Sequence, residues 1–199
     1  MAALFEACGD AAGTRLTSLG ALTPELSGIG SIAELVNGRM GRAARPVRAI
    51  AFDKTHANNW ALGWHQDRTI CVGQRSDVHG YGPWTKKQGM DHVEPPFSLL
   101  ERMLTIRIHL DEVGPDNAPL TIASGSHRHG RVKDEDVCGI VTNSEIAQCL
   151  ANPGDVWVYA TPVLHASAAS TSKLGPRVLQ LNYCADSLAH PLEWASNLT

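Results

Sequence analysis

The sequence has little that would link the chain to an oxidising compartment. It contains five cysteines, and no two of them are spaced as C-x-x-C: Cys8, Cys71, Cys138, Cys149 and Cys184. An odd number of scattered cysteines argues against a disulfide framework and against a zinc knuckle. We therefore expect free cysteines that are buried as small hydrophobic residues in a reducing compartment.

Signals for nucleic-acid binding, membrane insertion and secretion are also missing. The net charge is −3 and no basic run stands out, whereas binding to a phosphate backbone needs a concentrated positive face. No apolar stretch approaches the roughly 18 residues of a membrane span. Residues 1–13 carry Glu6 and Asp10 without a basic start, unlike a signal peptide. We expect a soluble, cytoplasmic protein that binds neither nucleic acid nor membrane, of unknown oligomeric state.

The composition that remains is that of an ordinary globular protein. Of the 199 residues, 43% are hydrophobic and 19% are charged. A chain of this length can bury roughly 70% of the surface that it exposes when unfolded, so it needs no disulfide to fold. Because no repeat, low-complexity tract or linker divides the sequence, we expect one domain over residues 1–199.

Strands and loops are expected to dominate, with few helices. One helix is predicted from the capping box Ser31-Ile-Ala-Glu34, with Asn37-Gly38 as its end, and a second from Thr142 to Leu150. The predicted strands are rich in β-branched and aromatic residues. They are 47–52, 69–72, 100–110, 120–123, 155–160, 163–169 and 177–183.

Residues 104–110 alternate strictly between apolar and polar side chains. One face carries only Leu and Ile, while the other carries Thr105, Arg107 and His109. A polar face on a strand that is expected to be central suggests a barrel that holds something charged. The aperiodic segment 73–96, with Tyr81 and Trp84, is predicted to be a binding loop or lid.

Three residues suggest a metal site. In an extended segment His65 and Asp67 project from one face, and His165 is predicted to lie at the end of another strand. Two imidazoles and one carboxylate on one face of a metal leave three positions open. This is the facial triad of non-haem Fe(II) oxygenases, in which the open positions take the co-substrate and O₂.

Arg177 and Ser167 suggest the co-substrate. Arg177 begins the strand after His165, and its guanidinium could bind a carboxylate in a forked geometry. Ser167 lies two residues beyond His165, on the same strand face, and could donate to that carboxylate. A molecule that chelates iron at one end and carries a free carboxylate at the other, 2-oxoglutarate, fits this pair.

The sequence resembles the phytanoyl-CoA dioxygenase family from about Val47 to Ala185. The motifs that carry the resemblance occur in the family's order, although Ala118-Pro119 stands where the family usually has Gly after Asn117, and the part before the barrel is short. They are Phe52-Asp-Lys54, Trp64-His-Gln-Asp67, the segment 109–117, Gly125-Ser-His127, Pro153-Gly-Asp155 and Leu164-His-Ala-Ser167 with Arg177.

The resemblance implies a mainly β fold, a double-stranded β-helix (a jelly-roll, cupin-like barrel) with a few supporting helices. It also implies iron ligands at His65, Asp67 and His165, and 2-oxoglutarate partners at Arg177 and Ser167. Ile50 and Arg107 would line the co-substrate pocket, with Arg107 standing where the family often has an aromatic residue. The implied reaction is oxidation of a C–H bond in a small organic substrate, with release of succinate and CO₂. The carboxylate at Asp67 favours hydroxylation, desaturation or cyclisation over halogenation.

Two other functions remain open at this point. A zinc hydrolase could use the same three ligands, although hydrolysis gives Arg177 and Ser167 no necessary role. A non-catalytic jelly-roll module that binds metal is the other. Among the other histidines, His109 could be a core or a pocket residue. The pair His127 and His129 is not expected to bind iron, and His127 is expected to support the metal ligands or to anchor a loop. Lys54 could contact an anionic substrate or end its strand.

Overall fold

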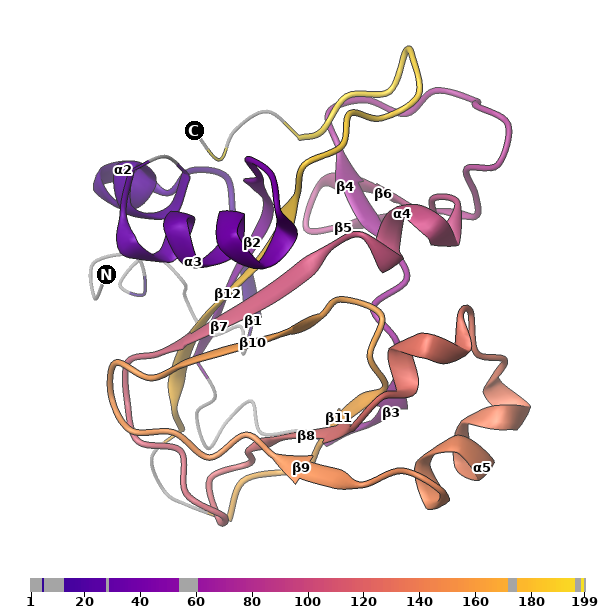
Figure 1. The fold of residues 1–199 in the computed structure, drawn as a ribbon. Helices are drawn as coiled ribbons and strands as arrows, with labels where there is room; N and C mark the ends of the chain where they lie inside the picture. The colour runs from indigo at the N-terminus through magenta and orange to yellow at the C-terminus, as the bar shows by residue number, and fades with distance from the viewer. Residues whose placement is uncertain are drawn as a thin grey trace.

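The fold consists of two antiparallel sheets that face each other, with a smaller third sheet beside them (Figure 1). The computed structural model describes residues 5, 13–27, 29–53, 61–171, 175–195 and 198. This is the mainly β, double-stranded β-helix arrangement that the sequence predicts. The predicted Lys54 contact lies outside the described residues.

The strands of each sheet are hydrogen-bonded in a defined order. The five-stranded sheet contains β1 (Gly13–Leu16), β2 (Arg45–Asp53), β12 (Arg177–Cys184), β7 (Leu104–His109) and β10 (Val156–Ala160). The four-stranded sheet contains β3 (Leu62–His65), β11 (His165–Ser167), β8 (Leu120–Ala123) and β9 (Ile146–Gln148). The third sheet contains β4 (Ile70–Val72), β6 (Met90–Val93) and β5 (Trp84–Lys87).

Short helices cover the sheets. They are η1 (Gly20–Leu22), α2 (Thr23–Ser27), α3 (Ser31–Met40), α4 (Phe97–Glu101), η3 (Ser126–His129), η4 (Asp134–Asp136) and α5 (Val137–Thr142). No helix in the described ranges has the length and apolar character that crossing a membrane requires. The strand predicted from residue 100 begins later, at Leu104, because α4 occupies the preceding segment.

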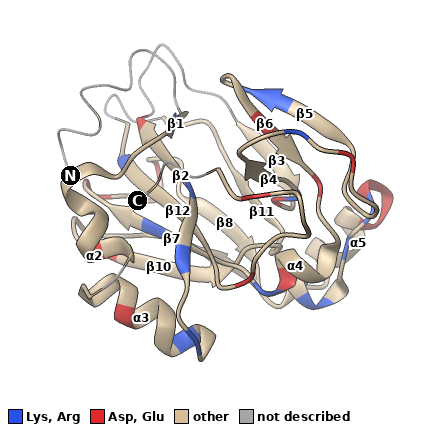
Figure 2. Cartoon of the chain, turned by 90° about the horizontal axis from the view of Figure 1, so that it is seen from above, with Lys and Arg blue, Asp and Glu red and all other residues tan. Residues whose placement is uncertain are grey.

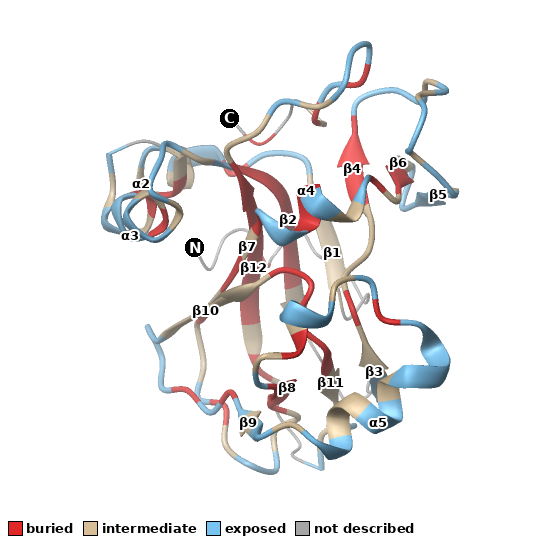
Figure 3. Cartoon of the chain, turned by 45° about the vertical axis from the view of Figure 1, so that its right-hand side comes forward, coloured by how far each residue is buried: buried red, intermediate tan, exposed pale blue. Residues whose placement is uncertain are grey.

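The alternation of side chains in the five-stranded sheet separates an apolar face from a polar one. Ile106, Ile108, Leu179 and Leu181 are buried in the core that α2 and α3 cover on the outer face (Figures 1 and 3). The other face carries buried polar residues and looks onto the four-stranded sheet. These residues are Arg48, Thr105, His109, Gln180 and Asn182. The prediction of a polar barrel interior is therefore confirmed.

The segment predicted to be an aperiodic lid is partly a β-hairpin. Strands β5 and β6 pair through a turn at Gln88 and Gly89, both of which have positive φ angles, 48° and 80°. Tyr81 and Trp84 pack against the apolar cluster that joins this third sheet to the five-stranded sheet. The prediction of an unstructured loop over the whole segment was wrong.

Helix α3 forms where the sequence predicts a helix, but its ends differ. Gly30 is the N-cap and Ser31 is already inside the helix, so no capping box forms. Instead, the carboxylate of Glu25 accepts hydrogen bonds from the Ser31 hydroxyl (2.7 Å) and the Ile32 backbone N–H (3.2 Å). The helix continues through Asn37-Gly38 and ends at Gly41, whose φ of 68° suits glycine.

The second predicted helix is wrong in position. Helix α5 ends at Thr142, where that helix was expected to begin, and Ile146–Gln148 forms strand β9. The side chains of Thr142, Asn143 and Ser144 each donate to the carbonyl four residues earlier, which closes the end of α5.

The described cysteines are free, as predicted, and three of the four are buried. Cys138, which lies in α5, is exposed and departs from the prediction of buried cysteines.

Candidate metal centre

Two neighbouring strands bring the histidines together. His65 is the last residue of β3 and His165 is the first residue of β11, and the two residues are directly opposite in the antiparallel pairing. Their ring centroids lie 4.3 Å apart. Two residues far apart in sequence thus become neighbours through one strand pair.

Backbone carbonyls orient both imidazoles in the same way. Nδ1 of His65 lies 2.7 Å from the Gly63 carbonyl oxygen, and Nδ1 of His165 lies 2.9 Å from that of Val163. Since a carbonyl only accepts, each Nδ1 carries the proton and donates. Each Nε2 is then left with a lone pair for a metal, as in most histidine-bound metal centres.

Asp67 completes the group. The donor atoms of His65, Asp67 and His165 all lie within 4.8 Å of one another. Burial is the main cause that lowers the pKa of His165 to about 4, so its imidazole is neutral at neutral pH. A neutral imidazole is the form that binds a metal.

Arg48 holds the Asp67 carboxylate in place. Its guanidinium lies 2.6 Å from one Asp67 oxygen, and only 8% of the Arg48 side chain is exposed. Burial alone would raise the pKa of Asp67, but Arg48 and the two histidines outweigh it and lower this pKa. Asp67 is therefore ionised at neutral pH.

A buried network fixes Arg48 in turn. Its Nε donates to the Asn182 side chain (2.7 Å), which donates to the Thr105 hydroxyl (2.8 Å). The Thr105 and Thr161 hydroxyls lie 3.0 Å apart. Our sequence analysis missed Arg48, although an arginine within the apolar stretch 47–52 is a usable signal.

Gln66 holds the segment between His65 and Asp67, a role that we also missed. Its amide donates to the carbonyls of Pro162 (2.8 Å) and Gly130 (3.0 Å), and its oxygen accepts from the Val132 N–H (3.0 Å). Gln66 is buried and ties His65 and Asp67 to the turn that precedes His165.

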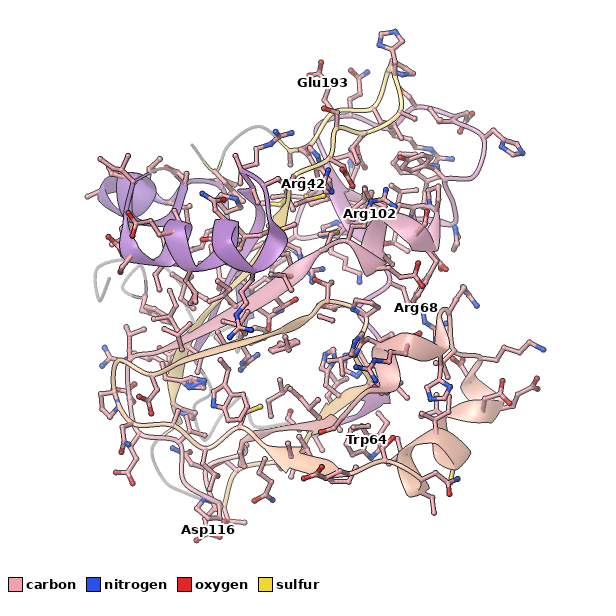
Figure 4. The ribbon with its side chains drawn as sticks, viewed as in Figure 1. Arg42, Trp64, Arg68, Arg102, Asp116 and Glu193 are labelled. Atoms are coloured by element: carbon pink, nitrogen blue, oxygen red, sulfur yellow. The ribbon has the colours of Figure 1, made fainter. Side chains whose placement is uncertain are left out.

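Trp64, which precedes His65 in the sequence, and Arg68, which follows Asp67, lie on the outside of the barrel (Figure 4). Trp64 packs against the small cluster of Ala123, Val132 and Leu164. Arg68 pairs with Asp134 at 2.8 Å. The alternation along the chain thus sends His65 and Asp67 inward and their neighbours outward.

Arg107 lies inside the barrel, close to His165. Its guanidinium donates to Gln180 (2.7 Å) and stands over the Phe52 ring, 5.1 Å from its centroid. The Tyr159 ring centroid lies 6.4 Å from that of His165. Within the described ranges, Arg107 has no acidic partner, and its buried Nε has no acceptor.

Arg177 is held away from the centre. Its guanidinium forms a two-point ion pair with Asp111, with both distances 2.9 Å, and its backbone N–H donates to the same carboxylate. Because Gln180 faces the interior and Leu179 faces the outer core, alternation along β12 puts Arg177 on the outer face. The structure therefore does not bring Arg177 together with the three ligands.

The other predicted site residues lie around the centre. Ser167 ends β11, paired with Leu62 and Leu120 on the flanking strands. His109 is buried beside Arg107 on β7, and neither of its ring nitrogens has a hydrogen-bond partner among the described residues. His127 and His129 lie in the turn η3, outside the metal-ligand group.

Comparisons with known proteins agree with this geometry. The family model described as "Phytanoyl-CoA dioxygenase (PhyH)" matches residues 33–178. A comparison with curated protein sequences gives no significant match.

Similar solved structures share the fold at low sequence identity. EctD from S. alaskensis in its apoform has a TM-score of 0.66 and 17% identity over 90% of this chain and 59% of that chain. The same protein with 2-oxoglutarate and 5-hydroxyectoine has a TM-score of 0.65 and 17% identity over 87% and 56%. The α-ketoglutarate-dependent carbocyclase SnoK has a TM-score of 0.53 and 15% identity over 77% and 54%. This chain thus spans little more than half the length of these proteins.

Proposed function

Because the chain belongs to the phytanoyl-CoA dioxygenase family, we propose that it is an Fe(II)- and 2-oxoglutarate-dependent dioxygenase. It would oxidise a C–H bond of a small organic substrate, with hydroxylation as the expected outcome. One observation carries the proposal: one ring nitrogen from each of two imidazoles and one carboxylate oxygen lie within 4.8 Å of one another inside a barrel. Similar solved proteins are described with Fe and with 2-oxoglutarate.

The donor set fits a ferrous ion. Two neutral nitrogens and one carboxylate oxygen make a facial triad, which leaves open positions for a chelating co-substrate and O₂. Arg48 occupies one oxygen of Asp67, so the other is available to the metal. Bound iron and 2-oxoglutarate would supply the oxidising chemistry, with succinate and CO₂ as co-products. The chain itself would hold the ligands in place, and its barrel would exclude water.

The distal carboxylate of 2-oxoglutarate has two candidate partners, and we propose Arg107 as the main one. Its support is its place inside the barrel near His165, its lack of an acidic partner among the described residues, and a buried Nε without an acceptor. Burying an unpaired cation is costly, and a ligand carboxylate would offset that cost. Gln180 would orient the guanidinium.

Arg177 with Ser167, the pair that the sequence suggests, is the second candidate. In this arrangement Arg177 would exchange the Asp111 carboxylate for that of the co-substrate, while Ser167 would donate from β11. The pair is partly exposed, 39% for Arg177 and 35% for Asp111, so such an exchange would break a weak interaction.

Anaerobic titration of the purified chain with Fe(II) and 2-oxoglutarate tests the proposal. A weak visible absorption that depends on both components is expected, and it should be lost in His165→Ala. His190→Ala is the control, because His190 is exposed in a loop. Circular dichroism checks the fold of each variant. No absorption from folded wild-type protein would favour a zinc hydrolase or a non-catalytic metal-binding module instead.

A further inference from the structure

Two basic side chains, those of Arg15 and Lys87, lie near Arg48. Arg15, on β1, pairs in register with Ile50 and so shares the inner face of the sheet with Arg48. Lys87 ends β5, the strand that carries two adjacent lysines (Figure 2). Both come from segments that flank the barrel rather than from its central strands.

The hairpin turn fixes Lys87 against β1. The Gln88 side chain accepts a hydrogen bond from the Arg15 backbone N–H (2.8 Å) and donates to the Gly13 carbonyl (2.9 Å). Two bonds from one side chain dock the turn on this strand edge. Arg15, Arg48 and Lys87 thereby come close enough to repel one another, and Lys87 and Arg48 in turn lie near Asp67.

A neutral histidine holds the Arg15 side chain. Nε of Arg15 donates to Nε2 of His92 (3.3 Å), while Nδ1 of His92 lies 3.1 Å from the Met90 carbonyl oxygen and donates to it. His92 is fully buried, and burial is the main cause that lowers its pKa to about 4. It therefore orients Arg15 without adding or neutralising charge.

The two carboxylates near this cluster, Asp67 and Asp91, each form an ion pair with another basic residue. Asp67 is taken by Arg48 at 2.6 Å, and Asp91 pairs with Lys86 at 3.6 Å. Neither Arg15 nor Lys87 forms an ion pair with a described acidic residue. Burial is the main cause that lowers the pKa of both groups, the neighbouring cations lower it further, and Asp67 offsets part of the shift.

A cavity of about 230 Å³ lies at this cluster. Arg15, Arg48 and Asp91 contribute its polar groups, and Val47, Val72 and Met90 are among its apolar walls. Arg48 lines the cavity and also binds Asp67, so one arginine side chain joins the cavity to the metal centre. The volume is below that of typical pockets for whole drug-sized molecules, and suits one end of a small substrate.

We propose that this cavity binds the oxyanion of a small anionic substrate, a carboxylate or a phosphate ester, through Arg15, with the positive charge of Lys87 at the neighbouring end of β5 adding to the attraction. The inference rests on the proposed function, because the oxidised carbon of the same molecule would lie at the metal of His65, Asp67 and His165. The apolar walls would contact the carbon skeleton next to the anion. Substrates with a cationic or neutral end at this position would be rejected.

Paramagnetic relaxation tests both binding and proximity. The full chain is loaded with Mn(II), which takes similar nitrogen and oxygen ligands, and is saturated with 2-oxoglutarate. Phosphorus relaxation of added inorganic phosphate and methyl-proton relaxation of added acetate are then measured. Enhanced relaxation of at least one probe is expected, with an affinity about tenfold weaker in Arg15→Gln and a smaller loss in Lys87→Gln, because Lys87 acts only through its charge.

The controls separate this inference from the proposed function. Lys133→Gln removes an exposed lysine elsewhere and should bind the probes as wild type does, and Arg15→Lys should recover part of the affinity. No enhancement, or equal loss in the Lys133 variant, would overturn the anion site while leaving the metal centre intact. If Mn(II) itself fails to bind, the proposed function fails. Calorimetry with phosphate and acetate on the metal-free chain then still decides whether the cavity binds anions.

Discussion

The assignment of Arg107 as the co-substrate partner can be tested by removing one guanidinium at a time. Arg107→Met keeps an unbranched apolar side chain over the Phe52 ring but removes the charge inside the barrel. Arg177→Met removes the two-point ion pair with Asp111. The two substitutions are chemically identical, so each is the matched control of the other.

The expected magnitudes follow from burial. Losing one partner of a desolvated, hydrogen-bonded charge pair costs about 2–4 kcal/mol, so Arg107→Met should weaken 2-oxoglutarate binding roughly 30- to 800-fold. The Arg177–Asp111 pair is more than one-third exposed on both sides, and its loss should cost at most about 1 kcal/mol of stability. We expect Arg177→Met to bind 2-oxoglutarate within about twofold of wild type.

The assay compares two co-substrates under anaerobic conditions with Fe(II). 2-Oxoglutarate carries the distal carboxylate, whereas 2-oxobutyrate has the same 2-oxo acid end without it. The Arg107→Met loss should be present for 2-oxoglutarate and absent for 2-oxobutyrate, because only the former reaches the guanidinium. If Arg177→Met instead shows the large, 2-oxoglutarate-specific loss and Arg107→Met shows none, the reasoning from burial and pairing is refuted.

Three further predictions test the surrounding structure. Gln66→Leu removes three hydrogen bonds, two of them buried, and should lower the free energy of unfolding by about 2–4 kcal/mol, measured in urea; an unchanged midpoint would rule out its role. His109 has a folded-state pKa of about 4 against an ordinary 6.5, mainly through burial. The unfolded chain therefore gains the proton first, and the free energy of unfolding falls as the pH drops from 6.5 towards 4. His109→Leu should make this fall with pH less steep, as measured by thermal melts at acid pH. An unchanged dependence of stability on pH would contradict the prediction. Glu25→Ala should lower the melting temperature because Glu25 caps α3, whereas Glu34→Ala, at the expected capping-box position, should not. If Glu34→Ala lowers the melting temperature and Glu25→Ala does not, the capping box predicted from the sequence would be correct.

The convergence of His65, Asp67 and His165 was predictable because it depends on local geometry. An i, i+2 pair in an extended segment points one way whatever surrounds it, so His65 and Asp67 converge once β3 forms. The turn before His165 then needs only to place β11 beside β3, and the barrel topology does this.

The orientation of Arg177 could not be read from the sequence, because one residue of register reverses a strand side chain. Whether Arg177 faces inward depends on the register in which β12 pairs with its neighbouring strands. In this register Arg177 lies opposite Asp53, and Val178 lies opposite His109. Spacing from His165 alone does not contain that information.

The β5–β6 hairpin and the end of α5 were missed for a different reason. The hairpin is set by positive φ angles at Gln88 and Gly89, and glutamine gives little signal for such a turn. Near Thr142, the residues that can begin a helix instead bond back to carbonyls and close one. In both places the same residue types are compatible with two local structures, and tertiary packing decides between them.

The central claim is that His65, Asp67 and His165 bind one ferrous ion. Anomalous diffraction at the iron absorption edge, from a crystal soaked anaerobically with Fe(II), locates that ion directly. The predicted result is a single peak roughly 2.0–2.2 Å from Nε2 of both histidines and from the Asp67 oxygen that Arg48 does not hold. A peak bonded elsewhere, or bonded through Nδ1 of either histidine, would contradict the account.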